Sequence, residues 1–176
     1  MNYKIDTLIR TKWHRGFQRK KPVSEIVIHG TDGGGTYDFV LRGDGVNRLG
    51  EKFSETYKKG VALFHYLIEP GGDVIEIIDP ERWVYHSTSG KHDELTIGIE
   101  VQKNSNVKSK PTQEQMFALV ALCQMLIKRF PKIDRVVSHD YNGLKYSARP
   151  PKPCPGAFDW GEFERLLDNE NVVVIK

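Results

Sequence analysis

Short runs of apolar, β-branched residues alternate with polar, glycine-containing segments through much of the chain. Runs of this length, bounded by glycine and proline, are typical of buried strands. The predicted strands cover residues 23–31, 61–68, 73–78, 95–101 and 135–138, and a short apolar run follows at 172–175. Glu69-Pro70-Gly71-Gly72 separates the second and third strands and predicts a turn that joins them as a hairpin.

One long segment has the helical period instead. Thr112 is its predicted N-cap, and Gln115 completes a capping box. The apolar stripe that follows comprises Met116, Leu119, Val120, Cys123, Met125, Leu126 and Ile127. This helix is expected to end near Phe130-Pro131 and to pack in the core rather than to hold a ligand.

Two other segments have weaker helical signals. A pattern of apolar residues at four-residue spacing covers residues 46–59, and a final helix is predicted from Trp160 to about Asn169. The glycine run at residues 32–35 is not followed by the Gly-Lys-Ser/Thr of a phosphate-binding loop, so we expect a surface loop there.

Composition agrees with one folded domain. The chain has 176 residues, of which 39% are hydrophobic and 28% charged, the usual balance for a globular protein. No apolar run approaches the roughly 18 residues that a membrane span needs. Because residues 1–6 lack the apolar segment and cleavage site of a signal peptide, we expect a cytoplasmic product or one released by lysis.

Positive charge is concentrated at the N-terminus. The net charge is +3, but residues 1–21 alone carry +6, so the rest of the chain carries −3. Trp13 and Phe17 lie among these cations, a pattern that indicates an anionic polymer as partner, either nucleic acid or an anionic cell-wall polymer. A solubilising, frayed terminus is the alternative. We therefore distinguish a basic arm, residues 1–21, from a domain at residues 22–176.

The two cysteines have different surroundings and do not make a disulfide framework. Cys123 lies in the helical stripe and is predicted to be a small core hydrophobe. Cys154 lies between two prolines in a polar loop, with Lys152 two residues before it, where a cation favours the thiolate. Such a loop buries little, so Cys154 is a candidate functional residue.

His29 and His139 both lie where a predicted strand ends, the position at which sites collect in α/β sheets. With Cys154 they offer three ligands of the types that zinc prefers and leave a fourth position for water. The separations of 110 and 15 residues match no local metal motif, so a structural role for either histidine also stays open.

Other polar groups lie in or beside the predicted strands. Glu100 lies inside an apolar strand, where a charge is unfavourable unless it is paired or used, and structural and functional roles are equally open. His65 is predicted to be a hydrogen-bonded sheet histidine. The segment 82–93 is dense in aromatic and hydrogen-bonding residues, as in loops that contact sugars or peptides.

Six short motifs follow one another in a specific order. They are Val27-Ile28-His29-Gly30-Thr31, Phe64-His65-Tyr66, Tyr85-His86-Ser87, Thr96-Ile97-Gly98-Ile99-Glu100, Ser138-His139-Asp140 and Lys152-Pro153-Cys154-Pro155-Gly156-Ala157-Phe158-Asp159-Trp160. In this order they resemble zinc N-acetylmuramoyl-L-alanine amidases of the amidase-2 or peptidoglycan-recognition-protein type. The resemblance extends from about Val23 to Leu167 and leaves out the basic arm.

The resemblance implies an α/β fold with a mixed central β-sheet flanked by helices and one Zn²⁺ in a surface groove at the strand ends. It makes His29, His139 and Cys154 the zinc ligands. The anhydromuropeptide branch commonly has aspartate as the third ligand, whereas Cys154 stands there in this sequence, as in phage and recognition-protein members.

The resemblance further implies roles for residues around the metal. Glu100 would act on the attacking water, and Lys152 would stabilise the oxyanion. His86 would line the substrate groove, and Tyr85 and Arg149 are expected to bind substrate as well. Phe64 stands where the lysozyme-type branch has a catalytic tyrosine, which moves the proton transfer to Glu100.

The expected reaction is hydrolysis of the amide between N-acetylmuramic acid and L-alanine in peptidoglycan. A phage or prophage endolysin, acting on the wall after release, is the first hypothesis, and a cytoplasmic recycling amidase for anhydro-muropeptides is the alternative. A non-catalytic peptidoglycan-binding module is a further alternative, but such relatives lack a zinc ligand, and all three positions are filled here. A nucleic-acid-binding protein would need a motif that this sequence lacks.

Overall fold

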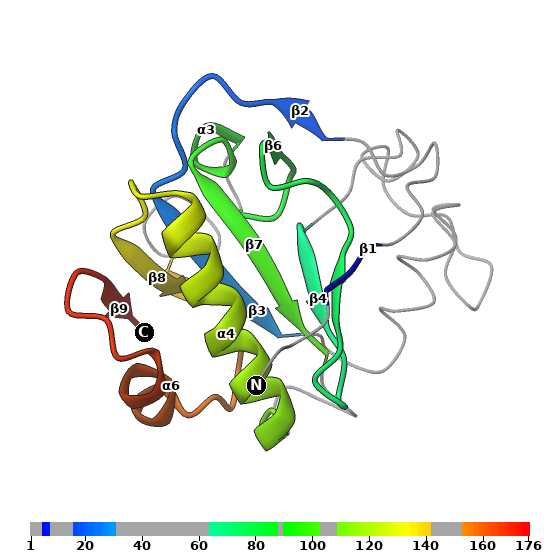
Figure 1. Cartoon of the computed structure of the whole chain (residues 1–176), viewed down its shortest axis with the longest axis vertical. Coiled ribbons are helices and arrows are strands. Elements are labelled where there is room, and N and C mark those ends of the chain that lie inside the picture. Colours follow the sequence, from blue (N-terminus) through cyan, green and yellow to red (C-terminus); the bar gives the residue numbers. More distant parts are fainter. Residues whose placement is uncertain (1–4, 8–15, 31–63, 88–89, 103–108, 142–152) are drawn as a thin grey trace.

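The computed structural model describes residues 5–7, 16–30, 64–87, 90–102, 109–141 and 153–176. Within them, a seven-stranded sheet forms the framework, and two helices pack on one of its faces (Figure 1). The predicted α/β fold with a mixed central sheet is therefore confirmed. None of the helices in this part of the chain is long and apolar enough to cross a membrane.

Parallel pairing dominates the sheet. From one edge to the other its strands are β1 (Ile5–Thr7), β5 (Val74–Glu76), β4 (Tyr66–Ile68), β7 (Thr96–Val101), β3 (Glu25–Gly30), β8 (Arg135–Ser138) and β9 (Val173–Ile175). β4 and β5 are antiparallel, as the predicted hairpin requires, and the other neighbours run parallel. The central strands are buried on both faces, which explains why they read as nearly continuous apolar runs.

The carboxyl ends of β3, β7 and β8 lie at the same edge of the sheet because these three neighbours are parallel. His29 is the penultimate residue of β3, and His139 follows the last residue of β8. Glu100 is the penultimate residue of β7. Three segments that are far apart in sequence thus bring polar groups to one end of the sheet.

Helix α4 (Gln113–Arg129) begins with the predicted capping box. The Thr112 hydroxyl accepts from the Gln115 backbone N–H at 3.1 Å, and the Gln115 side chain accepts from the Thr112 N–H at 3.0 Å. The Gln115 amide also donates to the carbonyl oxygens of Ile68 and Gln102, which ties the start of the helix to the ends of β4 and β7. These bonds satisfy donors that a helix start otherwise leaves without partners.

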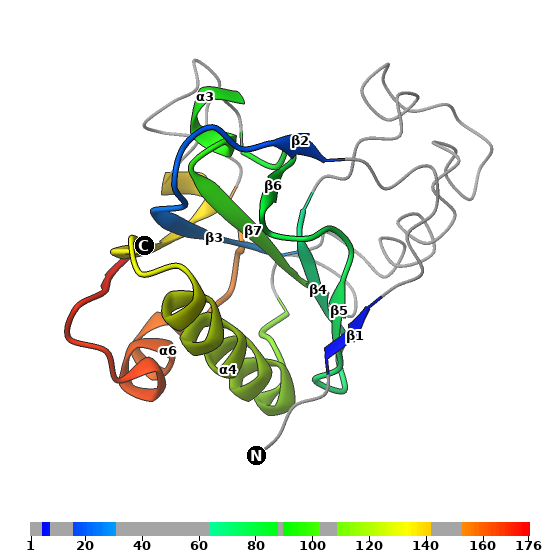
Figure 2. The same cartoon turned by 45° about the horizontal axis from the view of Figure 1, so that its top comes forward.

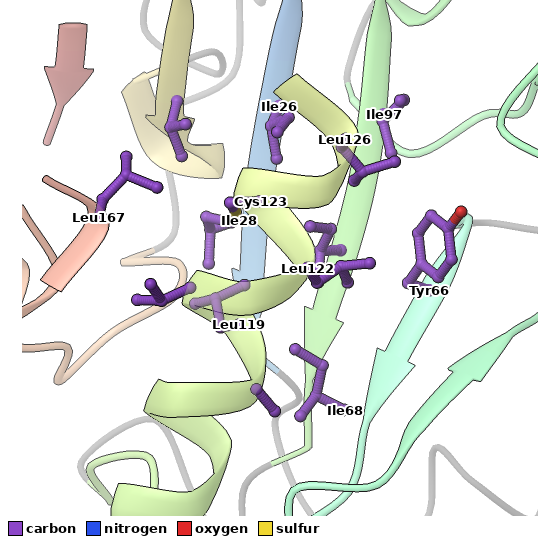
Figure 3. Packing of buried hydrophobic residues seen from close by; sticks show 14 of the residues in the cluster. Ile26, Ile28, Tyr66, Ile68, Ile97, Leu119, Leu122, Cys123, Leu126 and Leu167 are labelled. Carbon is purple, nitrogen blue, oxygen red and sulfur yellow. The ribbon is translucent and has the colours of Figure 1, made fainter. Parts of the chain in front are cut away.

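The main core lies between α4 and the sheet. Figure 3 shows α4 side chains, among them Leu119, Cys123 and Leu126, directed toward Ile26 and Ile97 on the strands. Helix α6 (Trp160–Leu167) lies beside α4 on the same face (Figure 2) and adds Phe163 and Leu167 to this cluster. Truncating a fully buried leucine in such a cluster costs roughly 2–5 kcal/mol. Cys123 is fully buried here, which confirms its predicted role as a core hydrophobe.

The N-terminal segment 16–21 packs against the domain through a second, two-stranded sheet and one arginine. Strands β2 (Phe17–Gln18) and β6 (Arg82–Trp83) pair antiparallel. The Arg19 guanidinium donates to the backbone carbonyl oxygens of Pro80, Asp93, Glu94 and Thr96. Burial lowers the pKa of Arg19 to about 10, although Glu81, Glu94 and Asp93 oppose that change. Arg19 is thus one cation of the basic arm whose charge is used inside the fold.

The remaining helical and strand predictions compare well with the structure. The final helix ends two residues earlier than expected, at Leu167, where Asp168 adopts a left-handed conformation (φ 44°). The run at 172–175 forms edge strand β9. The short helix α3 (Gly90–Asp93) and strands β1, β2 and β6 were not predicted. The predicted helix at 46–59 and the glycine loop at 32–35 lie outside the described residues.

Candidate metal centre

His29, His139 and Cys154 converge at the carboxyl end of β3 and β8. One potential ligand atom from each residue lies within 4.8 Å of the other two. His29 is buried, and His139 and Cys154 are partly buried. The rings of His29 and His139 lie 4.3 Å apart between centroids. Residues separated by 110 and 15 positions thus form one cluster, which no local sequence pattern could reveal.

Burial keeps both imidazoles neutral. It lowers the pKa of His29 well below 6.5, and the neighbouring His139 lowers it further. Burial also lowers the pKa of His139, although Asp140 opposes that change. A neutral imidazole has a lone pair available for a metal ion, so both side chains are in the ligand form at neutral pH.

Backbone contacts hold the Cys154 loop beside the two histidines. The Gly30 N–H points to the Cys154 sulfur at 3.5 Å, directly after His29. The Asp140 N–H donates to the Cys154 carbonyl oxygen at 3.0 Å, directly after His139. The cysteine is therefore fixed to the residues that follow both histidines.

This donor set fits zinc. Zinc prefers nitrogen and sulfur ligands such as imidazole and thiolate, whereas calcium and magnesium prefer oxygen ligands. Ligand atoms around a tetrahedral zinc ion lie roughly 3.3–3.6 Å apart. In this structure the three ligand atoms all lie within 4.8 Å of one another, which brings them close enough together to share one ion. Three protein ligands also leave one position for water or substrate.

Glu100 is the direct partner of His29 in the parallel register of β7 and β3. Side chains of register partners project from the same face of a sheet, so the carboxylate and the imidazole share a face. Glu100 is partly exposed, whereas its neighbours Ile99 and Val101 are buried. The structure therefore places this acid beside the candidate metal centre rather than in the core.

Phe64 has a different environment. It is buried in a second apolar cluster with Leu67, Ile75 and Val84 among others. With no ionisable group and an apolar surrounding, this side chain contributes packing and not proton transfer.

His86 does not lie in an exposed position. Its side chain has 0% exposure, and both of its ring nitrogens have polar neighbours. Nδ1 lies 3.1 Å from Nε2 of His29, and Nε2 lies 2.8 Å from the Thr96 hydroxyl oxygen. The side chain is thus buried between these two groups, and the expectation that His86 lines the substrate groove stays a prediction.

His65 is the sheet histidine that the sequence predicted. Its Nδ1 accepts from the Gly98 N–H at 2.9 Å, so its proton lies on Nε2 and points to the Arg82 carbonyl oxygen at 3.0 Å. Burial lowers the pKa of His65 to about 3, and the charge of Arg19 acts in the same direction. Both ring nitrogens are thus occupied by backbone groups.

Tyr85 belongs to an exposed aromatic group. Phe17 stacks on Trp83 with 4.4 Å between ring centroids, and Tyr85 meets both rings edge-on at 5.4 and 5.1 Å. Phe17 and Tyr85 are each 38% exposed. An exposed aromatic ring has a face on which a sugar ring can stack. Phe17 was seen in the sequence only as part of the basic arm.

Lys152 and Arg149, the predicted oxyanion and substrate residues, lie outside the described residues. The structure surrounds His86 with three residues that the sequence did not identify as site residues: Thr96, Gly98 and Asp93. Thr96 and Gly98 belong to one of the six motifs, but nothing in the sequence linked them to His86.

Comparison with protein families identifies a match over most of the chain. The model of the Amidase_2 family, described as N-acetylmuramoyl-L-alanine amidase, matches residues 19–157. The match begins at Arg19 and includes every residue of the candidate metal centre. A search of curated proteins finds no match.

Solved structures share the fold across nearly the whole chain. The "Endolysine N-acetylmuramoyl-L-alanine amidase LysCS" from Clostridium intestinale URNW is 20% identical, with a TM-score of 0.68 and coverage of 97% of each chain. A selenomethionine derivative of AmpD is also 20% identical, with a TM-score of 0.70 and coverage of 95% of this chain and 99% of that one.

A third similar structure contains a ligand. Human PGRP-IBETAC in complex with glycosamyl muramyl pentapeptide is 16% identical, with a TM-score of 0.64 and coverage of 91% of this chain and 94% of that one. At these identities the structural similarities establish the fold alone.

Proposed function

We propose, from the premise that this chain belongs to the Amidase_2 family of N-acetylmuramoyl-L-alanine amidases, that it is a zinc hydrolase. Its substrate would be the amide between the lactyl group of N-acetylmuramic acid and L-alanine in peptidoglycan. The observation that carries the proposal is the convergence of His29, His139 and Cys154 within a chain that matches this family over most of its length.

His29, His139 and Cys154 would hold the zinc ion. When bound, zinc supplies a Lewis acid that polarises the scissile carbonyl and makes water more acidic. The two histidines are suited to this role because burial keeps them neutral. The Gly30 N–H that points to the Cys154 sulfur would help to hold a thiolate there.

Glu100 would act as the general base and then as the general acid. It would take a proton from the attacking water and deliver it to the nitrogen of the leaving L-alanine. Its register pairing with His29 supports this role, because the two side chains then project from the same face of the sheet. Phe64 offers no competing acid in the tyrosine position.

The other proposed contacts rest on the family resemblance. Lys152 would stabilise the oxyanion with the metal, and Arg149 would bind substrate, but both lie outside the described residues. Tyr85 is the proposed contact for the glycan or stem peptide, supported by its exposure and its aromatic neighbours.

An anionic wall polymer is the proposed second partner. A cleft of about 540 Å³ is lined by the exposed side chains of Lys20, Lys21 and Lys132, among other residues. It lies where the chain enters β3 and β8, at the opposite end of these strands from His29. A positive cleft remote from the metal centre would hold the enzyme on a polyanion while the site acts.

A phage or prophage endolysin is the biological role that we propose first, with fold similarity to an endolysin as support. A recycling amidase for soluble anhydro-muropeptides is the alternative, since AmpD shares the fold as well. The two proposals differ in substrate: an endolysin would release fragments from intact sacculi, whereas a recycling enzyme would prefer soluble muropeptides.

Mass spectrometry of digested peptidoglycan, with metal analysis of the same protein sample, tests the reaction. We expect products with free muramic acid carboxyl groups and free L-alanine amino groups, about one zinc per chain, and no products after treatment with a chelator. Binding to sacculi without cleavage would favour a non-catalytic peptidoglycan-binding module instead.

A further inference from the structure

His86 lies enclosed between a proposed zinc ligand and a buried hydroxyl. Its Nδ1 is 3.1 Å from Nε2 of His29, and its Nε2 is 2.8 Å from Oγ1 of Thr96. A neutral imidazole has one N–H donor and one acceptor nitrogen. Both nitrogens of His86 are therefore committed to groups inside the protein.

The contact between Thr96 and Asp93 determines which group donates in each of these hydrogen bonds. The Thr96 hydroxyl lies 3.4 Å from the Asp93 carbonyl oxygen, which can only accept. The hydroxyl therefore donates to that carbonyl and accepts from the Nε2–H of His86. A carboxylate oxygen of Asp93 lies 3.9 Å from the same nitrogen and also favours a proton there.

This direction determines the tautomer of His29. With its proton on Nε2, His86 presents a lone pair at Nδ1, and the Nε2–H of His29 donates to it. The proton of His29 is then on Nε2, and the lone pair of its Nδ1 is left for another partner.

We propose that His86 is a positioning residue that holds His29 in the orientation and tautomer in which Nδ1 faces the zinc ion. Histidines that bind metals commonly donate their other N–H to a carboxylate or carbonyl, and loss of that partner lowers metal affinity roughly 10- to 100-fold. Here a second histidine, itself oriented by Thr96, would take that place. The inference rests on the proposed function because it presumes that His29 is a ligand.

The surroundings of His86 are built for this ring. A Cβ atom added at Gly98 would lie 2.7 Å from both Cγ and Nδ1 of His86, so the absence of a side chain there makes room for the imidazole. A carboxylate oxygen of Asp93 accepts from the N–H groups of His86 and Ser87, which holds the backbone that carries the ring.

The test compares His86→Leu with His86→Asn in the full chain. Leucine removes the acceptor, whereas the asparagine oxygen can replace Nδ1. We expect His86→Leu to lower zinc affinity roughly 10- to 100-fold in a chelator competition assay. His86→Asn should restore most of the affinity, and KM for a muropeptide should change little in either variant. Wild-type zinc affinity in a folded His86→Leu protein would overturn the proposal.

His65→Gln is the control, because His65 is also a buried histidine but its ring nitrogens have no hydrogen bond to His29 in the structure: Nδ1 accepts from the Gly98 N–H, and Nε2 faces the Arg82 carbonyl oxygen. Its zinc affinity should equal that of the wild type. If His86→Leu does not fold, Thr96→Val provides a milder change. Loss of the hydroxyl should lower zinc affinity several-fold. An unchanged affinity would contradict the proposal that Thr96 orients His86 and, through it, His29.

Nitrogen-15 NMR of the metal-free wild type separates this inference from the proposed function. We expect the ring proton of His29 on Nε2 and that of His86 on Nε2 as well. A proton on Nδ1 of His29 overturns the inference even if zinc binds. A wild-type protein that has the expected tautomers but binds no zinc contradicts the proposed function and with it the role assigned to His86.

Discussion

His29 and Glu100 are direct partners across two parallel strands, β3 and β7, and their side chains share one face of the sheet. This pairing joins a proposed metal ligand to a proposed proton carrier through the backbone ladder, without a flexible loop between them. Sites held by strands are positioned more precisely than sites on loops. The predictions below follow from this arrangement and from the groups packed around it.

Replacing Glu100 with Gln should lower kcat by about 10²- to 10⁴-fold, the usual contribution of a general acid–base group. Zinc content should stay at the wild-type level because Glu100 is not among the three clustered ligand residues. Steady-state kinetics on a defined muropeptide, with metal analysis, measure both quantities. Glu170→Gln changes an exposed acid and is the control; full activity in Glu100→Gln would remove Glu100 from the mechanism.

Replacing Cys154 with Ser should weaken zinc binding by more than about 100-fold, because even the loss of a ligand's hydrogen-bond partner weakens binding by 10- to 100-fold. Cys123→Ala is the matched control, since that thiol is buried in the core away from the cluster. Isothermal titration of the metal-free proteins gives both affinities. Equal affinities in the two variants would exclude Cys154 as a ligand.

His65 should make the protein sensitive to acid. Its folded-state pKa of about 3 lies below the ordinary value of 6.5, so between these values the unfolded chain binds a proton that the folded chain does not. Stability from this group is therefore complete above pH 6.5. It falls by up to about 1.4 kcal/mol per pH unit as the pH decreases toward 3.

The variant His65→Gln removes this titration while an amide can still accept from Gly98 and donate to Arg82. Urea unfolding between pH 4 and 7, with a chelator present, should give a shallower loss of stability than in the wild type. Burial raises the pKa of Asp93 to about 6, an effect of opposite sign, but it is common to both proteins and cancels in the comparison. Identical slopes would contradict the prediction.

Arg19→Met should lower the free energy of unfolding by about 3 kcal/mol or more. The guanidinium donates to four backbone carbonyl oxygens, and a buried acceptor without its donor costs about 1–3 kcal/mol. Lys20→Met is the control: Lys20 is exposed, and its bond to Glu94 uses the backbone N–H. Urea unfolding of both variants measures the difference, and a loss below about 1 kcal/mol for Arg19→Met would show that the carbonyls find other donors.

The double substitution of Lys21 and Lys132 by Glu should weaken binding to anionic wall polymer and reduce its dependence on salt. Both lysines line the same cleft, so the change cancels the net positive charge of the cleft lining, while the candidate metal centre at the other end of the strands is not altered. Co-sedimentation with sacculi at several salt concentrations measures the effect. Lys110→Glu, on a lysine outside the cleft, is the control. Unchanged sedimentation, or a loss of DNA binding alone, would contradict the wall-polymer proposal.

Local patterns predicted most of the regular structure. The capping box at Thr112, the turn after Ile68 and the apolar runs of β3, β7 and β8 are short-range signals, and the structure follows them. Strands β1, β2 and β6 have two or three residues each and depend on pairing partners far along the chain. No period can develop in so few residues, so a local pattern could not reveal them.

The residues of the candidate site could be predicted from the sequence, but the hydrogen bonds between them could not. The motifs and their order pointed to His29, His139 and Cys154, which the structure brings together. The bonds from His86 to His29 and to Thr96 depend on how loop 84–87 lies over the sheet, which spacing does not determine. Likewise, the contact between Nε2 of His92 and a carboxylate oxygen of Glu25, at 2.7 Å, joins residues that no motif connects.

The parallel pairing of β3 with β7 and β8 also has a kinetic consequence. In the register, Glu25 meets Thr96 and Arg135, so the centre of the sheet forms only after long stretches of chain have been brought back to β3. Pairings of this range slow folding, because the entropy of loop closure is lost before the contacts form. The three proposed ligands depend on the same closures. We therefore expect zinc uptake by a refolding chain to coincide with the slow acquisition of native structure, so that the metal reports completed folding rather than initiating it.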